Sequence, residues 1–192
     1  MLNVTREPGM IRPDFKTILL DQRGATVILW SFFTAFLALY VWIARAVVHD
    51  GVFLTNAAAA RLTRITLWLL VIVDLGYLSW WKKSKLSRKV LMGGSGAAKI
   101  LRALADHKGE VELRAASIIS TYVTRKVTAF AIIEAVAVYG FVLAVAGGYL
   151  WDLYLLSGLS LLLLVIEFPT KSFHEGLLSE IESAAAPSLG RS

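Results

Sequence analysis

The amino-acid sequence predicts an all-α integral membrane protein that forms a bundle of four transmembrane helices. Composition is the first reason, because the 192 residues are 57% hydrophobic and only 18% charged, with a mean hydropathy of +0.65. Soluble domains contain about 45–50% apolar and about 25% charged residues. The second reason is that the apolar residues gather in four long runs. Each run is close to or longer than the ~20 residues that a helix needs to cross a ~30 Å hydrocarbon core.

The four runs pair into two antiparallel hairpins, residues 25–81 and 127–168. The second hairpin needs only a tight turn, because residues 147–152 alone separate its two spans. Bulky aromatic residues followed by lysines end the second span, as is typical of a membrane interface: Trp80, Trp81, Lys82 and Lys83. The predicted spans, in chain order, are residues 25–48, 65–81, 127–150 and 153–168.

Three segments are predicted to lie outside the bilayer. Residues 1–24 form an amphipathic lead-in that suits the membrane surface. Residues 82–126 form a basic segment, in which apolar and charged residues alternate with a helical period after a glycine-rich hinge. We expect this amphipathic helix to be interrupted near Gly109 and to lead into the third span. Residues 169–192 form a tail, mobile at its end.

The distribution of basic residues predicts the orientation of the chain. Seventeen of the 20 lysines and arginines fall in the three segments outside the bilayer, whereas Arg45, Arg61 and Arg64 fall at the opposite ends of the spans. The positive-inside rule then predicts an N-in, C-in topology, and we expect the chain in a bacterial inner (cytoplasmic) membrane. The net charge of +6 therefore mainly reflects the orientation of the chain in the membrane, and we expect no nucleic-acid partner.

Residue types exclude most cofactors and most catalytic chemistry. The chain has no cysteine, which excludes thiolate metal sites, iron–sulfur clusters and cysteine nucleophiles. Its histidines, at positions 49, 107 and 174, all fall outside the interior of the predicted spans, where a b-type haem would need them. No metalloprotease, calcium-loop or serine-hydrolase motif is present. We therefore predict no cofactor, no metal site and no catalytic residue, and bound lipids are compatible with this composition.

Acidic residues within the spans are the candidate functional residues. An ionised carboxylate at the bilayer centre costs about 2.5–3.5 kcal/mol on insertion scales. Asp74 lies eight residues before Lys82 and Glu134 lies eight residues after Lys126, so both acids are about 12 Å inside the same face. If the second and third spans are neighbours, the two carboxyls can share one proton. Glu167 falls near that side at the end of the fourth span.

Three interpretations of these acids stay open. A protonated carboxyl can hydrogen-bond a polar side chain across a helix interface and contribute packing specificity alone. The acids can instead bind and release protons, or contact a basic residue of a partner subunit. The candidate hydrogen-bond partners for the first interpretation are Ser157, Ser160, Tyr139 and Tyr77.

Residues 131–145, AIIEAVAVYGFVLAV, resemble the outer helix of the c subunit of the rotary ATP synthase ring. In that family a mid-membrane glutamate lies among alanines, followed by alanine and, further along, by tyrosine and glycine. The resemblance implies that Glu134 occupies the position of the proton-carrying carboxylate. It covers this stretch of the third span, and the remainder of the chain differs from the family in having four spans and a long basic central segment.

Small residues recur at four-residue intervals in two sets on the third span, residues 131 and 135 and residues 140, 144 and 148, and this spacing lets helix backbones approach closely. They are Ala131, Ala135, Gly140, Ala144 and Gly148. Together with the absence of a soluble domain, this predicts a non-catalytic structural or accessory subunit that assembles with copies of itself or with a larger membrane complex. The alternative function is proton binding and translocation by Glu134 with Asp74. A membrane-anchored enzyme acting on lipid headgroups is a third class, for which the chain has no residue pattern.

Overall fold

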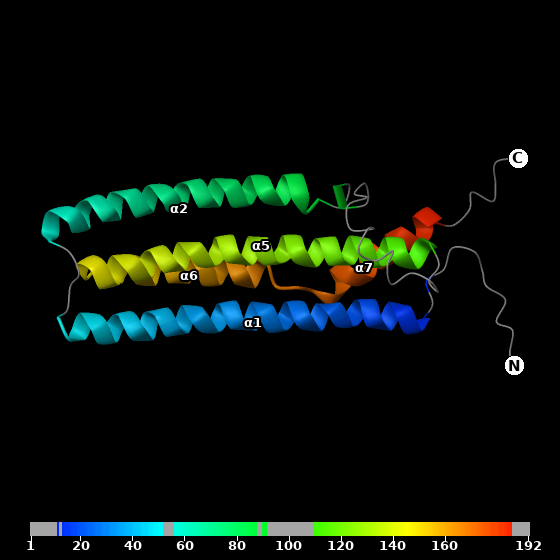
Figure 1. Ribbon diagram of the computed structural model, residues 1–192, viewed down its shortest axis with the longest axis horizontal. Helices are drawn as coiled ribbons and strands as arrows, with labels where there is room; N and C mark the ends of the chain where they lie inside the picture. Colours follow the sequence, from blue (N-terminus) through cyan, green and yellow to red (C-terminus); the bar gives the residue numbers. More distant parts are fainter. Residues whose placement is uncertain (1–10, 12, 52–55, 88–89, 92–109, 186–192) are drawn as a thin grey trace, which may run out of the picture. The chain divides into compact units, whose positions relative to one another are not determined.

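A computed structural model of the chain describes residues 11, 13–51, 56–87, 90–91 and 110–185 (Figure 1). These residues are overwhelmingly helical and contain no strand. The main helices, in chain order, are α1 (Pro13–His49), α2 (Ala57–Lys85), α5 (Glu110–Gly147), α6 (Leu150–Ile166) and α7 (Lys171–Ala185).

Several of these helices match the dimensions of a membrane. Helices α1, α2 and α5 each contain a stretch that is long and apolar enough to cross a bilayer, and α6 with α7 adds a fourth if the two are taken as one broken span. The prediction of an all-α chain with several helices long and apolar enough to span a membrane is therefore confirmed.

The chain divides into two compact units, and α1 and α5 contribute residues to both. Unit 1 consists of Met1–Thr26, Lys85–Arg125 and Pro169–Ser192, whereas unit 2 consists of Val27–Ser84 and Lys126–Phe168. Unit 2 therefore holds most of the apolar runs, and unit 1 holds most of the three segments predicted to lie outside them, although Lys82 and Lys126 belong to unit 2.

The first two helices are longer than the predicted spans. Helix α1 begins at Pro13, so residues 13–24 of the predicted surface lead-in continue directly into the first span. Proline suits this place, because its missing N–H needs no partner in the first helical turn. Helix α2 begins at Ala57, where Asn56 accepts a hydrogen bond from the backbone N–H of Ala59 at 2.9 Å. This cap adds two helical turns ahead of the predicted start at residue 65.

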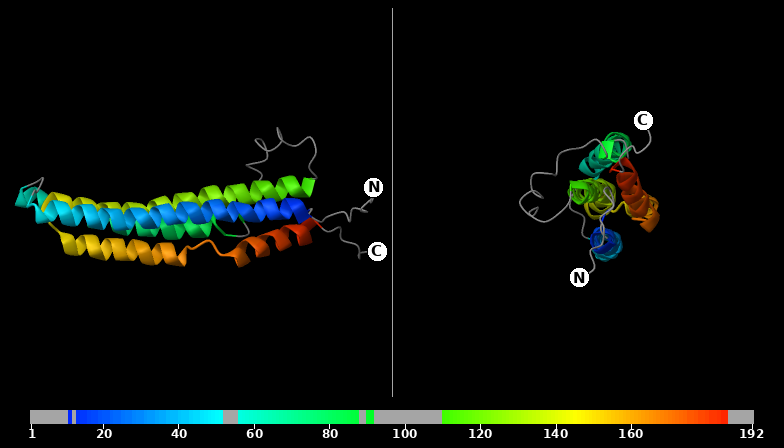
Figure 2. Two further views of the ribbon diagram at one scale, coloured as in Figure 1. Left: turned by 90° about the horizontal axis from the view of Figure 1, so that it is seen from below. Right: turned by 90° about the vertical axis from the view of Figure 1, so that its right-hand side faces the viewer.

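The second hairpin turns within two residues. Helix α5 ends at Gly147 and α6 begins at Leu150, antiparallel to it (Figure 2). Gly148 has a φ of +73° and donates its backbone N–H to the Ala144 carbonyl at 2.8 Å. Glycine is favoured here because other residues rarely adopt this left-handed conformation. Helix α6 ends at Ile166, three residues before Pro169, since proline disfavours helix in the residue before it.

Unit 1 contains a helix that the sequence pattern does not predict. Helix α7 lies in the predicted tail, and its apolar side chains recur at helical spacing and are buried. They pack with residues of α1 and α5, so that the described core of unit 1 contains Leu19, Ala115, Ala116, Ile118, Ile119, Tyr122, Leu177, Leu178 and Ile181. The predicted amphipathic helix also changes: residues 110–118 belong to α5 without a break, and residues 92–109, with Gly109, lie outside the described residues.

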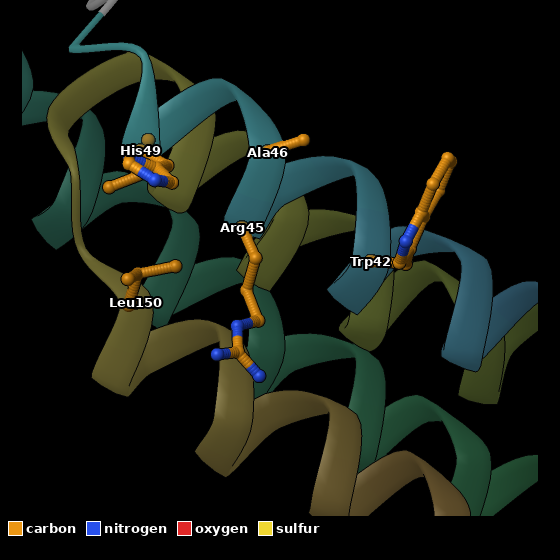
Figure 3. Close-up of a pocket in the computed structure, with 6 residues that line it drawn as sticks. Trp42, Arg45, Ala46, His49 and Leu150 are labelled. Atoms are coloured by element: carbon orange, nitrogen blue, oxygen red, sulfur yellow. The ribbon is translucent and has the colours of Figure 1, made fainter.

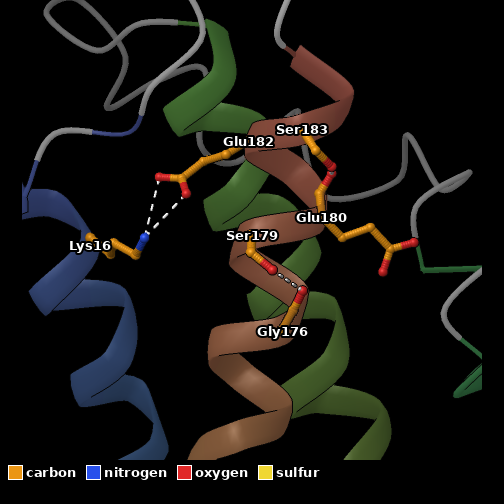
Figure 4. Close-up of polar contacts among 6 residues, drawn as sticks. All are labelled: Lys16, Gly176, Ser179, Glu180, Glu182 and Ser183. Carbon is orange, nitrogen blue, oxygen red and sulfur yellow. Dashed lines mark hydrogen bonds and ion pairs between the residues drawn. The ribbon is translucent and has the colours of Figure 1, made fainter.

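Polar contacts join α1 and α7 at the edge of the unit 1 core. The Lys16 ammonium of α1 lies 3.1 Å from a carboxylate oxygen of Glu182 in α7 (Figure 4). Arg23 Nε donates to the Pro169 carbonyl at 3.0 Å. His174 of α7 is fully buried and packs edge-on against the Tyr122 ring, with 5.3 Å between the ring centroids. The tail segment is thus attached to α1 and α5 by burial as well as by surface charge.

Unit 2 is organised around α5 and α6. Both helices contact α1 and α2, and Figure 1 shows them between those two helices. One apolar cluster joins α2, α5 and α6 through Val71, Val136, Leu143 and Leu156. A second joins α1, α5 and α6 through Ala44, Ala144 and Leu153.

Candidate functional site

The candidate site of this protein is the set of polar contacts between the helices of unit 2. Glu134 of α5 accepts a hydrogen bond from the Tyr40 hydroxyl of α1, with 2.9 Å between the oxygens. Both side chains are half-buried. The Tyr40 ring also packs against Phe141, with 5.5 Å between ring centroids. Glu134 is therefore held against α1 by a tyrosine 94 residues earlier in the chain.

Asp74 has a similar arrangement on the other side of α5. Its carboxylate accepts a hydrogen bond from the Tyr139 hydroxyl at 2.8 Å, so α2 and α5 are neighbours. Tyr139 lies five residues after Glu134, about 140° around the helix. In the part of the chain that the structure describes, no hydrogen bond joins Asp74 to Glu134. The two acids of matched depth thus bind separate tyrosines.

Glu167 is the centre of an ion-pair cluster. One carboxylate oxygen pairs with Lys82 of α2 and the other with Lys126 of α5. Glu167 and Lys126 are only 6% and 7% exposed, whereas the Lys82 side chain is 42% exposed. A buried carboxylate with two cations has its charge compensated, and the cluster joins three helical segments that are distant in sequence.

A second ion pair lies near the turn between α5 and α6. Arg64 of α2 contacts Asp152 of α6 through two nitrogens: Nη2 donates to Oδ1 at 3.0 Å, and Nε lies 2.7 Å from Oδ2. Asp152 is buried. The same guanidinium lies over the Tyr149 ring, 4.8 Å from its centroid. Such a two-point contact with cation–π stacking fixes the orientation of the arginine.

Small residues allow close approach of α5 and α6. A Cβ atom on Gly140 would lie 3.0 Å from the Leu153 Cα atom, so no larger residue fits without a shift. Ala144 is fully buried, Gly148 forms the turn, and Ala135 is half-buried, whereas Ala131 is exposed. The close approach is reinforced by the Ser160 hydroxyl, which donates to the Ile133 carbonyl at 2.9 Å.

The predicted interface anchors occupy the last turns of α2. Trp80 and Lys83 are exposed, Trp81 is half-buried, and Lys82 belongs to the Glu167 cluster. Among the described residues no group of three or more His, Asp or Glu side chains is arranged to hold a metal ion.

Several of these partners were missed by sequence reasoning. From the sequence, Arg64 is expected only as one of the charges that orient the chain, and Asp152 only as part of a turn. The positions of the two residues along the chain could have predicted this pair, because each lies near the start of its helix, at the end of an apolar run. Tyr40 carries no such pattern, since tyrosine is common near membrane interfaces. Tyr139 was among the four candidate partners named from the sequence, and it is the one that contacts Asp74.

Comparison of this chain with protein-family models, curated proteins and solved structures found no significant match.

Proposed function

We propose that this chain is a four-span integral membrane protein that acts as a non-catalytic structural or accessory subunit of a homo-oligomer or a larger membrane complex. One observation carries this proposal: apart from the exposed Asp50, the acids of unit 2 all have a partner on another helical segment of the same chain. These acids are Asp74, Glu134, Asp152 and Glu167. Acids used in this way join helices and need no substrate.

The fourth span in this proposal is α6. Its 17 residues measure about 25 Å, which is short for the hydrocarbon core. Its polar side chains Ser157 and Ser160 are buried, while large apolar side chains such as Leu162 and Ile166 are 57% and 63% exposed. Lipid is a suitable environment for such an exposed apolar face.

The proposed topology is N-in, C-in, in a bacterial inner membrane, with the hairpin turns facing outward. Because the chain has no native cysteine, single cysteines report on this directly. We expect Asn56→Cys, before α2, to react with a membrane-impermeant maleimide in intact cells. Ser87→Cys, after α2, should react only after permeabilisation. The reverse pattern would contradict the orientation, and equal labelling in intact cells would contradict a spanning α2.

The assembly is tested by co-expressing two differently tagged copies of the chain and purifying one tag in mild detergent. Recovery of the second tag indicates a homo-oligomer, and recovery of other membrane proteins in fixed stoichiometry indicates a larger complex. An unrelated multi-pass protein with the same tag, from the same membrane, is the control for non-specific capture. A monodisperse monomer without any co-purifying chain would contradict the subunit proposal.

The second candidate function is proton binding by Glu134 with Asp74. This candidate is favoured because both carboxyls lie in helices that are apolar enough to span a membrane, and each accepts a hydrogen bond from a tyrosine hydroxyl. The test is proton flux in proteoliposomes with Glu134→Gln and Asp74→Asn, and Glu175→Gln as the control outside unit 2. Unchanged flux, without pH-dependent carbodiimide labelling of Glu134, would remove this candidate.

A further inference from the structure

A groove at the end of α1 combines an arginine, a histidine and a tryptophan that none of the contacts described above uses. Its volume is about 540 Å³, and it is lined by Trp42, Arg45, Ala46, Val48, His49 and Leu150 (Figure 3). Five of these residues belong to α1, and Leu150 is the first residue of α6. In Figure 3, Arg45 and His49 lie one turn apart on α1 with Leu150 beside them.

The two basic side chains of the groove are available to a ligand. Both Arg45 and His49 are exposed, and within the described part of the chain neither has an ion pair or a side-chain hydrogen bond. The buried carboxylate nearest in sequence to Leu150 is Asp152, and Arg64 already engages it. Asp50, which follows His49, is exposed and likewise forms no ion pair there.

The order of the residues along α1 matches the layers of a membrane interface. Trp42 is 70% exposed and lies about 4.5 Å deeper than Arg45, whereas His49 lies about 6 Å further out. Tryptophan prefers the level where acyl chains meet headgroups, and an arginine at a helix end reaches outward to the phosphate level. Ala46, Val48 and Leu150 supply apolar side chains to the lining of the groove.

We propose that this groove binds the headgroup of an anionic phospholipid, with the guanidinium of Arg45 on the phosphate. His49 donates a hydrogen bond to the outer part of the headgroup, and Trp42 packs against the glycerol and upper acyl chain. A guanidinium suits the phosphate because it presents several N–H donors in one plane. This proposal rests on the membrane location of α1 and does not depend on the subunit role.

The test is competition between phosphatidylglycerol and phosphatidylcholine for the detergent-purified protein, measured by native mass spectrometry. We expect the native protein to retain phosphatidylglycerol preferentially. Arg45→Gln should weaken its retention about ten-fold, because the phosphate loses a hydrogen bond from a charged donor. Arg61→Gln is the matched control, because Arg61 is an exposed arginine at the start of α2 that does not line the groove.

Three results would overturn the proposal. The first is equal retention by Arg45→Gln and the native protein. The second is an equal loss in Arg61→Gln, which would mean that the attraction is spread over the surface. The third is displacement of the lipid by millimolar inorganic phosphate, which would make free phosphate the ligand. Equal unfolding midpoints for the two variants would show that a loss of lipid does not reflect misfolding.

Discussion

The substitution Glu167→Gln removes the central charge of the cluster that joins α2 and α5 to the residue directly after α6. It leaves two lysines without their carboxylate, and Lys126 is only 7% exposed. Breaking a buried ion pair from one side costs about 3–5 kcal/mol. Lys82 is partly exposed and can turn toward water, so we expect a loss near the lower limit, about 3 kcal/mol.

The assay is unfolding in mild detergent by titration with sodium dodecyl sulfate, followed by circular dichroism. Glu175→Gln is the matched control, because Glu175 forms an exposed pair with Lys171 at 3.4 Å, and such pairs contribute about 0–0.5 kcal/mol. The double variant Glu167→Gln/Lys126→Met should recover part of the loss, since it removes the uncompensated cation together with the carboxylate. A Glu167→Gln protein no less stable than Glu175→Gln, or a double variant less stable than Glu167→Gln, would contradict a buried, charge-compensated pair.

Two further substitutions test the packing of unit 2 in the same unfolding assay. Gly140→Val should destabilise the protein by about 1–3 kcal/mol through overpacking, because a Cβ at Gly140 would already lie 3.0 Å from the α6 backbone. Gly158 is the control, since a Cβ there meets nothing within 4 Å and valine should cause little loss. Equal losses at both sites would contradict the close approach of α5 and α6. Asp152→Asn should cost about 2 kcal/mol, because the Arg64 guanidinium loses a charge-assisted two-point contact. Asp50→Asn is its control on an exposed, unpaired acid, and an equal change in both variants would mean that the Arg64 contact does not stabilise the fold.

Local features of the chain were predictable to different degrees. The apolar runs located α1, α2, α5 and α6, but each boundary depended on neighbouring segments. Helix α7 was missed although its apolar residues recur at helical spacing, because a short polar tail after Pro169 gives no reason to expect burial. Its side chains become a core only when α1 and α5 lie beside them.

The sequence by itself determined the all-α class and the stretches long and apolar enough to cross a membrane. Both properties follow from composition and from the fixed rise of a helix, which are local. The tertiary structure alone decided the partners of the acids: Tyr40 for Glu134, and Lys82 with Lys126 for Glu167. These pairings depend on how each helix is rotated and shifted against its neighbours. Rotation and register result from side-chain packing between distant segments, and no local pattern in the chain encodes them.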